Sequence, residues 1–313
     1  MNKILNIVNG DAVSNRLKES GIADTFIPWG DFLHDGPVPE ALSLEELSKV
    51  RAKFISQKGL GEFSDIYKEF QKRDKMLKTF KEYNKIFLWF ENDLYDQLQL
   101  IQILDWFAKF ASEKNNIYII YPDNYLIKSN PKELYNFSLY NRELVTHSHF
   151  ITAKKAWATF CADTPYSLHK LLNDDTESLP FLKDAVKRIL EEYPNSINGL
   201  SKTAHQALLS ISNNIHNPND IFINYQKNEH RPFMGEIIFF LLLKELVEAN
   251  LLNSTKEGKY LELTTLGKEI LKGEKNLFNH TKVDRWIGGV HITNKNSWCW
   301  DIKSKNIIKY KVN

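Results

Sequence analysis

Three carboxylates stand within six residues of one another in this chain: Glu91, Asp93 and Asp96, directly after the apolar run 85–90. Carboxylates this close repel one another unless a cation or a proton lies between them. The motif therefore predicts a site for a divalent metal such as Mg²⁺, or acid–base catalysis by these side chains. Helix capping is the alternative for Asp93 and Asp96, because acidic residues favour a helix N-terminus, but capping leaves Glu91 unexplained.

A second candidate site, Asn9-Gly10-Asp11, follows the apolar run 3–8. A helix that begins here offers free backbone N–H groups, which bind anions such as phosphate. We therefore expect Asn9, Gly10 and Asp11 to bind a ligand, together with Gln97 of the first motif. The plainer interpretation is that Asp11 only caps the helix and that Gly10 only forms the turn.

The third candidate is the pair His34 and Asp35, in a segment from Phe32 to Pro39 whose glycine and two prolines predict a loop. A histidine beside an aspartate is suited to act as a general base near neutral pH. The alternative is a solvent-exposed turn made of ordinary turn residues.

Apolar runs place these motifs at the ends of strands. Four runs predict strands that alternate with four predicted helices: strands at 3–8, 25–31, 85–90 and 115–122, and helices at about 12–20, 43–57, 63–82 and 98–111. This alternation is typical of a parallel sheet with helices on both faces. We predict that residues 1–125 form a small Rossmann-like α/β domain, although the chain has neither the dinucleotide glycine motif nor a Walker loop.

Parallel strands end at one edge of their sheet, and ligands of open α/β sheets bind at that edge. The three motifs should therefore gather there. On this prediction Asp11, Glu91 and Asp93 hold a metal ion, and His34 acts as the base.

The rest of the chain has a different pattern. Residues 126–150 are predicted to connect the first domain to a mostly helical domain, 151–313, which ends in a winged-helix-like unit with a basic hairpin. The apolar run 237–243 predicts a buried helix and is far too short to span a membrane. The last 32 residues hold seven Lys and Arg against two Asp and Glu, a mild indication of an anionic partner.

Composition favours a cytoplasmic protein with no membrane association. Hydrophobic residues make up 42% and charged residues 26% of the chain, as in ordinary globular proteins. The two cysteines, Cys161 and Cys299, lie far apart in sequence, which favours a reducing compartment over a disulfide framework. The first residues lack the long apolar stretch of a secretory signal.

Several motifs together resemble a known family. The segments NGD at 9–11, LHDGPVP at 33–39 and WFENDLYDQLQLIQILDW at 89–106 are similar to the bacterial family named domain of unknown function 1835 (DUF1835). The later segments NGLSKTAHQALL, RPFMGE, LTTLGKEIL and DRWIGGVHI resemble the helical half that often follows that domain. In the family, His commonly stands where this chain has Asn92. The resemblance implies no assigned activity; it implies the site residues Asn9, Asp11, His34, Glu91, Asp93, Asp96 and Gln97.

Three functions are compatible with these features. The first is binding, hydrolysis or transfer on a phosphate-containing small molecule such as a nucleotide. The second is a non-catalytic interaction or regulatory protein. The third is a DNA-binding regulator that acts through the C-terminal winged-helix-like unit. The segment 201–211 weakens the third, because it holds a single lysine where a recognition helix normally brings several cations.

Overall fold

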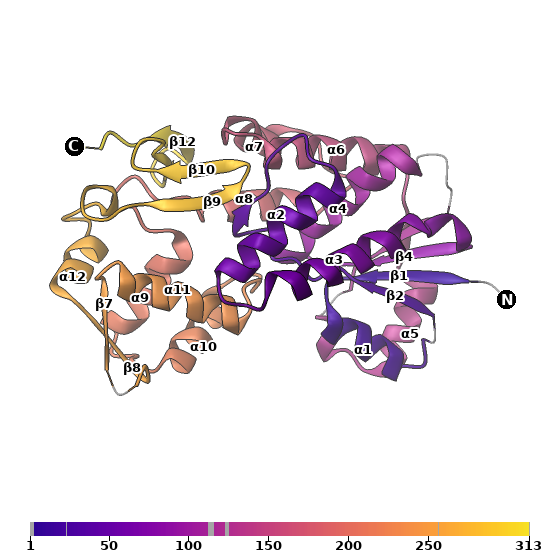
Figure 1. The fold of residues 1–313 in the computed structure, drawn as a ribbon, viewed down its shortest axis with the longest axis horizontal. Coiled ribbons are helices and arrows are strands. Elements are labelled where there is room, and N and C mark those ends of the chain that lie inside the picture. Colours follow the sequence, from indigo (N-terminus) through magenta and orange to yellow (C-terminus); the bar gives the residue numbers. More distant parts are fainter. Residues whose placement is uncertain (1–2, 23, 112–115, 123–124, 256, 313) are drawn as a thin grey trace.

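The computed structural model describes residues 3–22, 24–111, 116–122, 125–255 and 257–312. Within them the protein is a mixed α/β structure whose main sheet has the strand order β2-β1-β4-β5-β6 (Figure 1). These strands are β1 (Ile4–Val8), β2 (Thr25–Pro28), β4 (Lys85–Trp89), β5 (Ile117–Ile120) and β6 (Arg142–Leu144). The first four are parallel, and β6 runs antiparallel to β5. The predicted α/β class and its mostly parallel sheet are thus confirmed.

Helices cover both faces of this sheet. α1 (Asp11–Glu19) and α5 (Pro131–Tyr140) cover one face, and α3 (Phe63–Lys78) and α4 (Leu94–Phe110) cover the other (Figure 1). Successive strand residues enter different apolar clusters, since Ile7 packs with α4 whereas Val8 packs with α1. Burial on both faces explains why the strands read as continuous apolar runs.

Most of the other elements extend the apolar cluster on the α3 and α4 side of the sheet. These other elements are β3 (Gly36–Pro37), α2 (Leu44–Gln57), η1 (Phe80–Glu82), η2 (Leu126–Lys128), α6 (His147–Cys161), α7 (Tyr166–Lys170), η3 (Leu171–Asn173), α8 (Leu182–Leu190), α9 (Lys202–Ser212), α10 (Pro218–Asn228), α11 (Glu236–Glu248), β7 (Leu252–Thr255), β8 (Tyr260–Leu263), α12 (Thr265–Lys272), η4 (Leu277–Asn279), β9 (Asp284–Gly288), β10 (Val290–Thr293), β11 (Trp298–Asp301) and β12 (Asn306–Lys309). Because α4 packs against α6 and α8, one buried cluster reaches from Leu5 in β1 to Ile307 in β12.

The segment 126–150, expected to be a connector, contributes to the main sheet. It holds η2, α5 and the edge strand β6, which pairs Glu143 with Ile119 of β5. β6 has the sequence Arg-Glu-Leu and is buried at none of its positions. It therefore lacks the apolar run by which the other strands were predicted.

The predicted loop at 32–39 contains β3, which joins the two halves of the chain. β3 pairs in parallel with β9, and the N–H of Val38 donates to the carbonyl of Gly288 at 2.7 Å. Gly36 adopts φ 88°, a left-handed conformation that favours glycine. The basic hairpin that contains β9 and β10 is thus one part of a three-stranded sheet with the order β10-β9-β3.

The apolar run 237–243 does form a helix, α11, but its predicted burial is wrong for part of its surface. Phe239, Leu243 and Leu246 are buried, whereas Ile237 is 65% exposed. The elements that pack most against α11 are α9, α10 and β7. None of the described helices is both long and apolar enough to cross a membrane.

Candidate functional site

The four parallel strands end level with one another. Val8 pairs with both Pro28 and Trp89, and Trp89 pairs with Ile120. Residues that directly follow these positions therefore lie along one edge of the sheet. This edge contains Asn9 after β1 and Glu91 after β4, as the sequence predicts.

Asp96 is at the centre of a buried carboxyl cluster, formed by Glu91, Asp93 and Asp96. The Asn9 Nδ2 donates to both carboxylate oxygens of Asp96, at 3.0 and 3.1 Å, and the Glu91 N–H donates to Asp96 Oδ2 at 2.5 Å. Asp93 is the N-cap of α4 and accepts from the Asp96 N–H at 3.1 Å. Its predicted capping role is confirmed. Glu91 accepts from the N–H of Leu126 at 2.6 Å, which links the end of β4 to η2.

Glu91 holds a proton at neutral pH, and the pKa values of the other two carboxyls of the cluster are raised as well. Burial, reinforced by the charge of Asp96, raises the pKa of Glu91 to about 8. Burial also raises the pKa of Asp96 to about 7, against the lowering effect of the hydrogen bonds from Glu91 and Asn9. The pKa of Asp93 is raised well above its usual range by burial and by the Asp96 charge. None of the ion pairs between described residues involves these three carboxyls.

The predicted metal ligands do not come together. Over the described part of the chain, no group of three or more His, Cys, Asp or Glu side chains is arranged to hold a metal ion. Asp11 is the exposed first residue of α1 and makes no capping bond, because Gly10 occupies the N-cap position. Glu91 and Asp93 are instead buried, and each already accepts a backbone N–H.

His34 is close to the edge but fully enclosed. Its side chain lies edge-on to Phe233, with ring centroids 5.0 Å apart, and 6.2 Å from the ring of Tyr95. Both ring nitrogens are buried without a hydrogen-bond partner among the described residues. Burial lowers the pKa of His34 to about 4, although the charges of Asp35 and Glu192 oppose this shift. The imidazole is therefore neutral at pH 7. The alternative interpretation of this segment as a solvent-exposed turn is wrong for His34, which is buried.

Asp35 is held by cations rather than presented as a base. Its carboxylate lies 3.3 Å from Lys58 Nζ and 3.8 Å from Arg285 Nε. These cations keep its pKa below the usual range despite burial, which acts in the opposite direction. The contacts of Asp35 thus tie the loop to α2 and β9, whereas the contacts of the carboxyl cluster run to β1 and η2.

Two further residues of the edge support the cluster. The Gln97 Nε2 donates to the Glu91 carbonyl at 2.8 Å, which fixes the end of β4. The Tyr95 hydroxyl donates to the Asn9 carbonyl at 3.3 Å. Burial raises the pKa of Tyr95 above its usual range.

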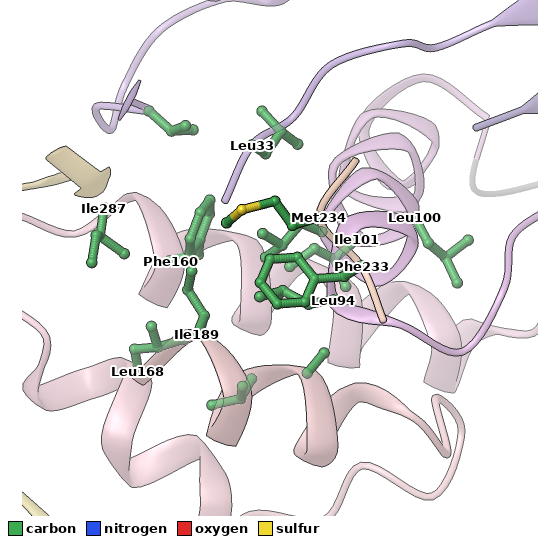
Figure 2. Packing of buried hydrophobic residues seen from close by; sticks show 14 of the residues in the cluster. Leu33, Leu94, Leu100, Ile101, Phe160, Leu168, Ile189, Phe233, Met234 and Ile287 are labelled. Atoms are coloured by element: carbon green, nitrogen blue, oxygen red, sulfur yellow. The ribbon is translucent and has the colours of Figure 1, made fainter. Parts of the chain in front are cut away.

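A strap from the C-terminal half, residues 230–234, crosses this edge between α10 and α11. Arg231 Nη1 donates to the Asn92 carbonyl at 3.2 Å, and the Tyr125 hydroxyl donates to the Pro232 carbonyl at 3.1 Å. Figure 2 shows Phe233 and Met234 of the strap among the apolar side chains of α4, all within one buried cluster. No sequence signal linked the strap to the edge, because its contacts depend on chain segments more than a hundred residues away.

A cavity of about 120 Å³ opens between Asn92–Leu94, α8, the start of α9 and the strap. Asp93 belongs to its lining. The lining also carries four cations, and they are Lys187, Arg188, Lys202 and Arg231. Neither Gly10 nor Asp11 is part of the described lining.

Replacing Glu91 with Gln is expected to stabilise the protein in a pH-dependent way. The pKa of Glu91 in the folded protein, about 8, lies above its usual 4.5. The stability that the protonated Glu91 contributes is therefore fully present below pH 4.5 and is lost as the pH rises through 8. The substituted amide keeps an oxygen for the Leu126 N–H and has no proton to lose. Urea unfolding should show equal stability at pH 5 and a gain of about 2 kcal/mol at pH 9.

Glu69→Gln on the exposed face of α3 is the matched control and should show no such gain. A Glu91→Gln protein that is less stable at both pH values would show that the carboxylate has a structural role.

Comparisons with known proteins do not identify the chain. No protein-family model matches it, and no curated protein matches it in sequence. The resemblance to the DUF1835 family stays a prediction, and the function has to be inferred from the geometry of the site.

Proposed function

We propose that the protein binds a small phosphate-bearing molecule in the cavity beside Asp93, and hydrolyses or transfers one of its groups by acid–base catalysis. One observation carries this proposal: Asp93 belongs both to the proton-holding carboxyl cluster and to the lining of a cavity rich in cations. A proton donor and an anion-binding surface thus meet at one place. Perturbed carboxyls in a cavity are typical of catalytic sites.

The charge and size of the cavity favour a phosphate group. Besides Asp93, whose pKa is raised, the lining carries four cations against three carboxylates, Asp184, Glu191 and Glu229. A volume of about 120 Å³ is smaller than the roughly 300–1,000 Å³ of sites that enclose a whole cofactor or drug-sized ligand. The cavity therefore suits the phosphate end of a nucleotide-like ligand, with the remainder outside it.

The chemistry follows from the two protonation states of Asp93. Its carboxyl would donate a proton to the leaving oxygen as the bond from that oxygen to the transferred group breaks. A water or an acceptor hydroxyl forms the new bond, and its proton passes to the Asp93 carboxylate, which restores the acid. Burial, together with the neighbouring Asp96 and Glu91 carboxyls, raises the pKa of Asp93 and so favours its proton-donating form.

Calorimetric titration with inorganic phosphate tests the binding step. We expect wild-type protein to bind phosphate and Lys187→Met to bind it more weakly, whereas Lys183→Met, on the same helix but outside the cavity, should bind as the wild type does. A folded wild-type protein that binds no phosphate would refute the proposal.

The catalytic step is tested on ribonucleoside monophosphates, with products followed by ³¹P NMR and chromatography. Asp93→Asn keeps a side-chain oxygen for the N-cap of α4 but cannot donate the acid proton. It should bind phosphate and lower turnover by about 10²- to 10⁴-fold. Phosphate binding without turnover of any substrate in the wild type would leave a binding protein, in line with the interaction or regulatory alternative.

The four parallel strands, covered by helices on both faces, support the description of residues 1–125 as Rossmann-like.

DNA binding through a C-terminal winged-helix-like unit has weaker support. Lys202 at the start of α9 lies 2.7 Å from Glu191, and β9 of the basic hairpin pairs with β3. A wing that enters a DNA groove needs cations free to meet phosphates.

A further inference from the structure

We infer that Arg231 is the residue that recognises the phosphate group of the ligand, and that Asp184 is the carboxylate that the phosphate displaces. This inference rests on the proposed function, and it names the determinant of specificity within that site. Arg231 reaches the cavity from the strap, so the C-terminal half would supply the recognition of the anion and the N-terminal half the acid.

The guanidinium of Arg231 is already positioned. Its Nη1 lies 3.1 Å from Asp184 Oδ2 and 3.2 Å from the Asn92 carbonyl, and its Cζ lies 5.0 Å from the centre of the Phe181 ring. Both polar contacts use the same nitrogen, whereas a guanidinium carries five N–H donors. The planar group can therefore receive a phosphate in a two-pronged arrangement without leaving the Asn92 carbonyl.

The other cations of the cavity are less suited to this role. Arg188 donates to Glu229, Glu192 and Thr203, and its side chain is only 11% exposed. Lys202 is already paired, since its Nζ lies 2.7 Å from Glu191 Oε2. Lys187 is exposed and carries a single compact charge on a flexible stem, which attracts an anion without orienting it.

The partner of Arg231 is easily exchanged. The Asp184 side chain is 59% exposed, and ion pairs in contact with water contribute only about 0–1 kcal/mol. Replacing this carboxylate with a doubly charged phosphate removes a weak contact and forms stronger ones. Because Arg231 also bonds to Asn92, a phosphate held by Arg231 would lie next to Asp93, where the acid proton is needed.

The test compares two variants whose phosphate affinities should change in opposite directions. Arg231→Met should lower the affinity for inorganic phosphate by about tenfold to a hundredfold, the usual loss for a charge-assisted contact. Asp184→Asn should raise the affinity, by about two- to fivefold, because it removes the competing carboxylate. Arg231→Lys should fall between Arg231→Met and the wild type. Asp220→Asn, on the exposed surface of α10, is the control and should change nothing.

A merely structural ion pair would not separate the two variants, because the loss of either partner would act in the same direction. Wild-type binding that Arg231→Met leaves intact while Lys187→Met weakens it would overturn the inference and leave the proposed function standing. Wild-type protein that binds no phosphate would overturn both. If Arg231→Met does not fold, the opposite shifts of Arg231→Lys and Asp184→Asn decide the question, and equal affinities in both would overturn the inference.

Discussion

Replacing Arg188 with methionine is expected to lower the free energy of unfolding by about 3–5 kcal/mol, among the largest effects of any single substitution in this protein. Arg188 donates to Glu229 at 2.6 Å, to Glu192 at 2.7 Å and to the Thr203 hydroxyl at 2.8 Å. The side chains of Glu192 and Glu229 are 1% and 2% exposed. Without Arg188, both carboxylates stay buried without their main counter-charge, and that desolvation makes the loss large.

Urea unfolding followed by tryptophan fluorescence at pH 7 measures this effect. Lys187→Met, the exposed neighbour on α8, should change stability by no more than about 0.5 kcal/mol. Arg188 and Arg285 hold the pKa of Glu192 at about 2 despite its burial. The stability that this carboxylate contributes is therefore present above pH 4.5 and is lost as the pH falls towards 2. A loss below about 1 kcal/mol for Arg188→Met would contradict this account.

Replacing Arg51 with methionine should cost a similar amount, about 3–5 kcal/mol. Arg51 lies on α2 and is fully buried, and its Nε and Nη2 donate to Asp31 at 3.0 and 2.8 Å. It also donates to the carbonyls of Asp35, at 2.8 Å, and Phe32, at 3.1 Å. One side chain thus satisfies a buried carboxylate and two backbone groups of the loop that carries His34.

A double-mutant cycle separates these contributions. Asp31→Asn removes the charge that Arg51 neutralises, so Arg51→Met should cost less in that background than in the wild type. Lys53→Met, exposed on the same helix, should be nearly neutral. Strictly additive losses would show that Arg51 acts through the loop carbonyls and not through Asp31.

The sequence was most informative where a local pattern decides the structure. The parallel strands follow from their apolar runs, and the helix predicted at about 43–57 is α2, which begins at a capping box of Ser43 and Glu46. The edge that gathers Asn9, Glu91 and Asp96 follows from the rule that parallel strands end together. These features depend on a few neighbouring residues each.

The features that the sequence did not predict depend on distant segments. The cations of the cavity come from α8, α9 and the strap, and nothing near Arg231 or Lys187 shows that they meet Asp93. The same cause explains β6, whose residues carry no apolar run, and the enclosure of His34, which requires Phe233. The choice between a metal site and a proton-holding cluster likewise required the burial of Glu91 and the exposure of Asp11.

The pairing of β3 with β9 has a consequence for folding during synthesis on the ribosome. Gly36 meets Ile287, so about 250 residues must be made before the loop around His34 finds its partner strand. At about 5–20 residues per second, that interval lasts roughly 12–50 s. The nascent N-terminal half spends this interval with the loop unpaired. Until residues 230–234 have been made, the carboxyl cluster also lacks its contacts with the strap. A chain released before residue 287 would lack the partner of β3 altogether.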